Sequence, residues 1–324
     1  MAASRNVNSV ESHQPTQPDG FFDPRLGTPP ILLESTLVEI GIFEPKRTNC
    51  FSVYLVEAGT GTFWADTSEH VYQPHQLLFF VPYQRCRFEV WTRTQLIRIR
   101  FHANFLCVET FHAETGCSGA LFNDPYGIPL VNLNAEARRD VVELIRRMQA
   151  EQTHEQLGSQ DALLACMRLL LIVATRLKPA ISEPVVSEID HRDHILEELR
   201  EHIEQNYQQL HAPAAYAELM HMTPQTLGRY VRQALGKTLT DLIRQRILTH
   251  AKWQLLHTLK PVKQVAAEVG FRDELYFSRV FKKATGVSPR FFREFETKIR
   301  NGSNLSMSSA DSSISNSDAA GENT

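Results

Sequence analysis

The strongest constraint on the fold of this chain is a long amphipathic pattern near its C-terminal end. From Leu239 to Leu259, apolar residues recur at spacings of three or four, which is the repeat of one helix face. Thr238 and Asp241 provide a start that resembles a capping box, and Pro261 ends the pattern. A helix over these 21 residues would be about 31 Å long, because each residue adds about 1.5 Å.

The residues before this helix predict a helix-turn-helix unit. An amphipathic helix over 194–207 is followed by a short helix over 214–220. Thr223 is a typical N-cap residue, Pro224 fits the first helical position, and Gly236 fits the position just after a helix. We therefore expect a second helix between the cap and the glycine.

The residues after the long helix repeat this arrangement. A short helix over 262–269, a turn at Gly270-Phe271 and a helix over 274–284 precede a last helix over 290–295. Adjacent major grooves on one face of DNA lie about 34 Å apart. A rigid connector of the predicted length would place two recognition helices in successive major grooves.

Charge is unevenly distributed along the chain, although the formal net charge is only −3. Residues 210–300 contain 16 Lys and Arg against 7 Asp and Glu, a net charge of +9, whereas residues 1–209 have a net charge of −9. A compact basic block of this kind is the electrostatic footprint of nucleic-acid binding.

Composition excludes several other classes of protein. The chain is 42% hydrophobic, and no apolar run approaches the ~18 residues that a membrane helix needs, so we expect no membrane partner. The N-terminus lacks a signal-peptide pattern, which predicts a cytoplasmic location. Five scattered cysteines without a C-x-x-C pair argue against a disulfide scaffold or a zinc ribbon.

The first half of the chain predicts strands followed by helices, so the whole chain is expected to be α+β. Short apolar runs over 31–133, with strict alternation at Ile97, Ile99 and Phe101, favour a small sandwich or barrel. From Asn134 the spacing changes to that of two antiparallel helices. The expected divisions are a disordered segment over 1–30, a sensor and dimerisation domain over 31–178, a linker over 179–190, a DNA-binding domain over 191–297 and a disordered tail over 298–324.

An ordered motif runs through the second helix-turn-helix unit. It comprises Gln264 to Phe271, Asp273, Tyr276 to Arg279, Phe281 to Lys283, Gly286 and Ser288-Pro289. In this order the residues resemble the C-terminal signature of the AraC/XylS family of bacterial transcription regulators, and the resemblance covers residues 194–296. It implies a sequence-specific DNA-binding regulator, typically an activator, with a cupin-like β-barrel and two dimerisation helices in the N-terminal half. The partners it implies are double-stranded promoter DNA, a second copy of the chain, RNA polymerase and a small-molecule effector.

Early residues of a recognition helix face base edges in the major groove. Gln can pair with adenine, Arg with guanine and Glu with cytosine, while Leu can contact a thymine methyl group. The resemblance places Arg229 and Arg279 at the family's usual base-contacting positions. The base-reading candidates are Gln225, Thr226, Arg229, Glu274, Leu275 and Arg279.

Other basic residues are better placed for phosphates, which supply affinity without sequence information. These candidates are Arg232, Lys237, Lys282, Lys283 and Arg290. The alternative for every DNA candidate is an ordinary solvated surface side chain. A further set recurs at helical spacing and is expected in the core: Tyr276, Phe277, Phe281, Phe291 and Phe292.

Arg98, Arg100 and His102 share one face of a predicted strand. If that face points into a barrel, it suits an anionic effector such as a carboxylate or a sugar acid; the alternative, which we favour at this point, is an outward face in solvent. The N-terminal histidines lack the spacing of a cupin metal site, so we expect neither a metal nor another cofactor.

Two other functions remain open. The first is a cupin-type metal-dependent enzyme fused to a DNA-binding module, although no catalytic constellation stands out and we expect no enzyme activity. The second is an interaction adaptor with a decayed DNA-binding module. A stoichiometric metal would favour the enzyme, and salt-dependent binding to promoter fragments would exclude the adaptor.

Overall fold

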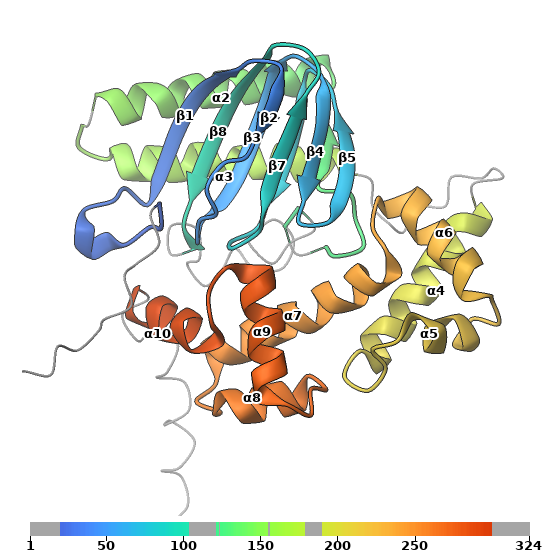
Figure 1. Ribbon diagram of the computed structural model, residues 1–324. Coiled ribbons are helices and arrows are strands. Elements are labelled where there is room, and N and C mark those ends of the chain that lie inside the picture. Colours follow the sequence, from blue (N-terminus) through green and yellow to red (C-terminus); the bar gives the residue numbers. More distant parts are fainter. Residues whose placement is uncertain (1–19, 104–120, 123, 155, 179–189, 300–324) are drawn as a thin grey trace, which may run out of the picture.

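The structure is a computed structural model that describes residues 20–103, 121, 122, 124–154, 156–178 and 190–299, and every structural statement below concerns these ranges. Antiparallel sheets and two helices form the N-terminal part, and helices alone form the C-terminal part (Figure 1). The predicted α+β class is therefore confirmed. Within the described ranges, none of the helices has both the length and the apolar character needed to cross a membrane.

Two antiparallel sheets contain the strands of the N-terminal part. A five-stranded sheet has the order β1-β8-β3-β6-β9, and a four-stranded sheet has the order β2-β7-β4-β5. The strands are β1 (Ile31–Val38), β2 (Gly41–Phe43), β3 (Phe51–Ala58), β4 (Gly61–Ala65), β5 (Ser68–Tyr72), β6 (Gln76–Phe80), β7 (Cys86–Val90), β8 (Thr94–Phe101) and β9 (Leu130–Asn132).

Alternation along the strands gives the five-stranded sheet two different buried faces. Val53 and Ile99 belong to a core shared with the two helices, whereas Tyr54 and Leu96 belong to the aromatic core between the sheets. Because successive side chains point to opposite faces, every second residue of β3 and β8 lies between the sheets. This arrangement agrees with the predicted sandwich or barrel.

The two helices that follow the sheets cover the outer face of the five-stranded sheet. They are α2 (Ala135–Thr153) and α3 (Ser159–Leu177), and the side chain of Asn134 caps α2 by accepting a hydrogen bond from the Ala137 amide. Val141 and Met167 are fully buried in the shared core. The predicted pair of helices is confirmed, and their placement leaves the other face of the sheet free to pack on the second sheet (Figure 1).

The C-terminal part consists of helices in the predicted order. They are α4 (Asp190–Asn206), α5 (Pro213–Leu219), α6 (Pro224–Leu235), α7 (Leu239–His257), α8 (Val262–Glu268), α9 (Glu274–Thr285) and α10 (Pro289–Ile299). The long connector α7 is unbroken over 19 residues, or about 28 Å. It ends two residues before the predicted Leu259, because Thr258 already has an extended backbone.

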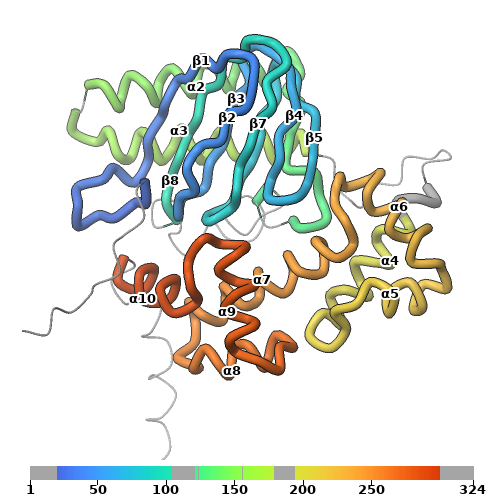
Figure 2. Tube along the Cα trace, in the orientation of Figure 1, coloured from blue at the N-terminus to red at the C-terminus, as the bar shows by residue number. Residues whose placement is uncertain are grey.

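The expected disorder at both ends is wrong for the described residues there. Phe21 and Phe22 are buried, although they lie in the segment that was expected to be disordered. The Asn49 side chain accepts a hydrogen bond from the Phe22 amide and donates one to its carbonyl oxygen. At the other end, α10 extends to Ile299, which is also buried. Figure 2 shows the start of the described chain, in blue, above α10. The rings of Phe21 and Phe295 are in contact, with 5.9 Å between their centres.

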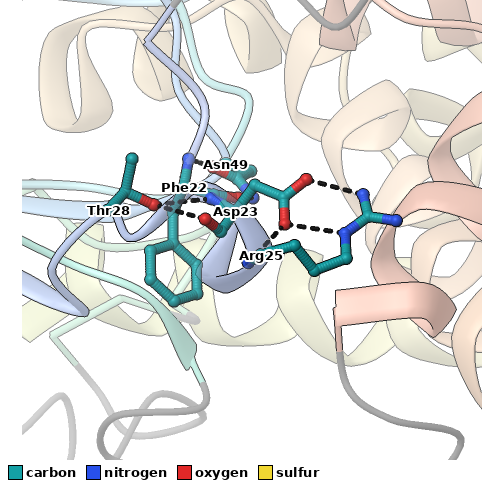
Figure 3. A network of polar contacts seen from close by, with 5 residues as sticks. All are labelled: Phe22, Asp23, Arg25, Thr28 and Asn49. Carbon is teal, nitrogen blue, oxygen red and sulfur yellow. Dashed lines mark hydrogen bonds and ion pairs between the residues drawn. The ribbon is translucent and has the colours of Figure 1, made fainter.

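A compact polar network holds this N-terminal segment in place (Figure 3). The buried Asp23 carboxylate accepts hydrogen bonds from the Arg25 amide and guanidinium, which lower the pKa of Asp23. Thr28 closes the loop by donating its hydroxyl to the Asp23 carbonyl oxygen. Charged and polar residues thus order a segment whose composition alone predicted disorder.

Residues 1–19, residues 179–189 of the predicted linker 179–190 and the tail from residue 300 lie outside the described residues. Asp190, the last residue of that linker, begins α4 instead. The domain boundaries stay predictions.

Gly236 and Gly228, two glycines of the first helix-turn-helix unit, differ in whether their position can accept a side chain. Gly236 follows α6 with a φ of 63°, and an added Cβ there would lie 2.4 Å from the Glu69 carbonyl oxygen. Gly228 lies inside α6, and an added Cβ would meet no atom within 4 Å. Only the first position therefore requires glycine.

We expect Gly236→Ala to lower the free energy of unfolding by at least about 1–2 kcal/mol, because the left-handed backbone and the contact with Glu69 both oppose a side chain. Gly228→Ala should raise it by about 0.5–1 kcal/mol through helix propensity. Urea denaturation of both variants provides the measurement. Equal effects at the two positions would contradict the assigned backbone geometry.

Candidate DNA interface

The second helix of each helix-turn-helix unit has a side-chain N-cap: Thr223, which the sequence indicated, and Asp273, which it had offered only as part of the motif. The Thr223 side chain accepts a hydrogen bond from the Thr226 amide at the start of α6. Asp273 accepts hydrogen bonds from the amides of Leu275 and Tyr276 at the start of α9. These bonds fix the first turn of each helix, which is the part that would enter a major groove.

Most of the base-reading candidates are accessible. Gln225 and Arg229 on α6, and Leu275 and Arg279 on α9, are exposed, whereas Thr226 and Glu274 are partly buried. The Thr226 hydroxyl lies 2.8 Å from the Thr223 hydroxyl, so the cap already uses part of its hydrogen-bonding capacity. The exposed four have the accessibility that a contact with DNA bases requires.

Tyr276 does not lie in the core, contrary to the prediction. Its side chain is 54% exposed, and the Arg279 guanidinium lies 5.9 Å from the centre of its ring. Phe277 and Phe281 occupy the buried face of α9 one turn apart, so the preceding residue is rotated toward solvent. If the helical repeat had been counted from Phe277 and Phe281, the sequence would have placed Tyr276 on the exposed face, beside Arg279. The other predicted core aromatics are buried, or partly buried in the case of Phe291.

Four of the five phosphate candidates are also exposed. They are Arg232, Lys282, Lys283 and Arg290. Arg290 forms an ion pair with Glu294 one turn further along α10, with 2.7 Å between Nε and the carboxylate. A competing phosphate would have to replace that surface pair, which costs little because such pairs contribute at most about 1 kcal/mol.

Lys237 is the exception, and its predicted phosphate contact does not fit the structure. The side chain is 5% exposed, and Nζ donates hydrogen bonds to the carbonyl oxygen of Pro125 and to the side chain of Gln245. Burial lowers the pKa of Lys237 to about 8. The left-handed turn at Gly236 directs the chain against β5, where the Glu69 amide donates to the Gly236 carbonyl oxygen.

His102 is not part of an effector site in this structure. It is fully buried, its ring stacks on Phe22, and Nε2 lies 3.4 Å from the Glu296 carboxylate of α10. The Tyr83 hydroxyl donates a hydrogen bond to the same carboxylate. His102 directly follows the last residue of β8, and its contact with Glu296 of α10 joins the two halves of the protein.

Arg98 and Arg100 lie on the inner side of the five-stranded sheet, on the same face of β8 as Leu96. The inward orientation is the one that we did not favour from the sequence. Sequence could not settle it, because an alternating strand has the same pattern whichever face points inward. Separately, the described residues contain no cluster of three or more His, Cys, Asp or Glu that could hold a metal ion.

Comparison with known proteins finds similarity concentrated in the two helix-turn-helix units. A family of helix-turn-helix domains matches residues 216–294, from α5 into α10. The arabinose operon regulatory protein of Escherichia coli (strain K12) is 41% identical over 80 residues, which are 25% of this chain and 27% of that protein. The transcriptional activator RhaR of Enterobacter sp. (strain 638) is 24% identical over 177 residues, 55% of this chain and 62% of that protein. The chain therefore spans less than two thirds of these relatives.

Among solved structures, an apo form of ToxT from Vibrio cholerae is similar over 82% of this chain and 98% of its own. The sequence identity is 12% and the TM-score is 0.35.

We expect His70, which adjoins Gly236 and Lys237, to make stability depend on pH. Burial, and to a smaller extent the charge of Lys237, lowers the pKa of His70 to about 4 from its ordinary 6.5. Between these values the unfolded chain binds a proton that the folded chain does not, so the free energy of unfolding falls as pH falls from 6.5 to 4. The loss is on the order of 3 kcal/mol.

Urea denaturation at pH 7 and pH 5 tests this expectation. His70→Phe should reduce the difference between the two pH values, whereas His154→Gln, at an exposed position on the N-terminal part, should preserve it. An unchanged difference in His70→Phe would exclude His70 as its source.

Proposed function

We propose that this chain is a sequence-specific DNA-binding transcriptional regulator, because residues 216–294 match a family of helix-turn-helix domains. The observation that carries the proposal is the unbroken helix α7 between two capped recognition helices with exposed side chains. Its length of about 28 Å is close to the ~34 Å separation of adjacent major grooves on one face of DNA. One molecule can then insert α6 and α9 into successive grooves.

The two recognition helices have different chemistry. On α6, Gln225 and Arg229 suit adenine and guanine, with Thr226 as a weaker contact. On α9, Arg279 suits guanine, Leu275 suits a thymine methyl group, and Glu274 suits cytosine. The phosphate contacts are assigned to the exposed set, Arg232, Lys282, Lys283 and Arg290, without Lys237.

The relatives named above are transcriptional regulators, and we extend this role to the whole chain as a proposal. Promoter DNA is the main partner, and a cytoplasmic location follows from it. Helices α2 and α3 are assigned to dimerisation, the N-terminal sheets to sensing a small molecule, and the outcome to activation through RNA polymerase. The proposal includes no catalytic step, and metal analysis of the purified protein tests the enzyme alternative.

Selection of bound sequences from a random DNA library, followed by footprinting, tests the proposal. We expect two protected major-groove segments about one helical turn apart on the same face of the duplex. Binding should weaken steeply as salt concentration rises. A single protected segment, or binding that does not depend on salt, would contradict the two-helix arrangement.

Arg279→Ala should weaken binding to the selected site by about 1–3 kcal/mol and relax the preference at one base pair, because one bidentate contact with guanine is lost. Competition assays with the selected site and with variants at each position measure both effects. An equal loss on random DNA would show that Arg279 does not read a base.

Lys283→Ala should weaken binding to all sequences similarly and reduce the slope of log affinity against log salt by about one unit, since one phosphate contact disappears. Arg93→Ala, at an exposed position between β7 and β8, serves as the control and should leave the slope unchanged. If both variants show the parental slope, Lys283 is not a phosphate contact.

A further inference from the structure

A cavity of about 470 Å³ lies beside β1 and β8 on the inner side of the five-stranded sheet. This volume falls within the range of small-molecule sites, about 300–1,000 Å³. Leu96 and Phe43 provide apolar wall, while Tyr54, Arg98 and Arg100 provide polar groups. The cavity therefore combines apolar and polar lining, as in sites that bind an organic molecule in one orientation.

Arg98 is a largely buried cation with weak compensation. Its side chain is 15% exposed, and the nearest carboxylate oxygen recorded for it, on Glu34, lies 3.9 Å away. The guanidinium also lies 3.2 Å from the neutral Ser52 hydroxyl and 5.5 Å from the centre of the Tyr54 ring. A buried charge normally has a close, well-aligned counter-charge, because removing it from water is costly.

The charges around the cavity do not balance. Arg98 and Arg100 line it as cations, and Glu34 is the one acidic residue among the described residues of its lining. Among the described residues, the hydrogen bond recorded for the Arg100 side chain goes to the Gly20 carbonyl oxygen, at 3.3 Å. The excess positive charge favours an anionic occupant.

Tyr54 provides a second, independent observation. Its side chain is 2% exposed, and its hydroxyl has no hydrogen-bond partner in the part of the chain that the structure describes. The neighbouring Cys86 thiol is a poor hydrogen-bond partner for the Tyr54 hydroxyl, because sulfur forms only weak hydrogen bonds. Burial raises the pKa of Tyr54, so the hydroxyl keeps its proton and remains a donor. Buried polar groups without partners are rare in folded proteins.

We propose that this cavity binds a small organic anion. Its carboxylate pairs with Arg98 and Arg100, an oxygen accepts a hydrogen bond from the Tyr54 hydroxyl, and its apolar part packs against Leu96 and Phe43. This inference rests on the small-molecule sensing proposed above for the N-terminal sheets and names the chemical class of the ligand. It does not depend on DNA binding, since the site belongs wholly to the N-terminal part.

Calorimetric titration of the full chain with two matched pairs of probes tests the proposal. The pairs are benzoate with benzamide and D-glucuronate with D-glucose, in which the charged group is the main difference. We expect at least one anion to bind at least tenfold more tightly than its neutral partner. If neither anion binds at least tenfold more tightly than its neutral partner at concentrations up to about 10 mM, the proposal is overturned. A dissociation constant above this value corresponds to less than about 3 kcal/mol of binding free energy.

Three variants assign the contacts, using whichever anion binds. Arg98→Gln and Arg100→Gln should each weaken binding about tenfold or more, and Tyr54→Phe about two- to tenfold, because a neutral hydrogen bond is worth less than an ion pair. Arg87→Gln is the control: Arg87 lies over Trp64 on the four-stranded sheet and lines no part of this cavity.

Thermal denaturation confirms that each variant is folded before binding is compared. Full anion affinity in both folded arginine variants would place the anion elsewhere and overturn the proposal. DNA binding is measured separately, so loss of the anion site and failure of the proposed regulator function give different results.

Discussion

The burial of one face of α7 is the constraint on which the C-terminal half depends. Leu242, Ile243, Ala251 and Leu255 are almost completely buried and belong to one core that includes both helix-turn-helix units. The helix packs against α5 and α6 and also against α8 and α10. Because a single rigid helix supports both units, their recognition helices keep a fixed separation, which is the geometric basis of the proposed function.

The same core continues into the N-terminal half, so the two halves are packed together in this structure. Phe21 and Tyr83 join it from the N-terminal side, and Tyr83 contacts both Phe292 and Glu296 of α10. Gly236, which follows α6, accepts a hydrogen bond from β5. Gly286, which follows α9, lies so near Arg47 that a Cβ would come within 3.2 Å of its guanidinium. The N-terminal half thus contacts the equivalent corner of each helix-turn-helix unit, and Lys237 is buried as a result.

The errors in the sequence analysis have a common physical origin. Tyr276, Lys237 and His102 each have a type and spacing compatible with their predicted places. What decides their actual positions is the rotation of α9 about its axis, the docking of β5 on Gly236 and the packing of α10 beside β8. The order of Phe21 and Phe22 was missed for the same reason, since their partners Tyr83, Phe295 and His102 lie far away in sequence.

Local physical chemistry was sufficient to predict the helices and several of their ends. Asn134, Thr223 and Asp273 cap helices through hydrogen bonds to residues two or three positions away, and Gly236 and Gly286 end helices through their own backbone freedom. The charge asymmetry and the approximate length of α7 can likewise be predicted from the sequence alone. Only the tertiary structure decided that Arg98 and Arg100 face the space between the sheets and that Tyr54 lies beside them. An alternating strand is equally compatible with either orientation, and the choice is made by which of its faces the helices α2 and α3 cover.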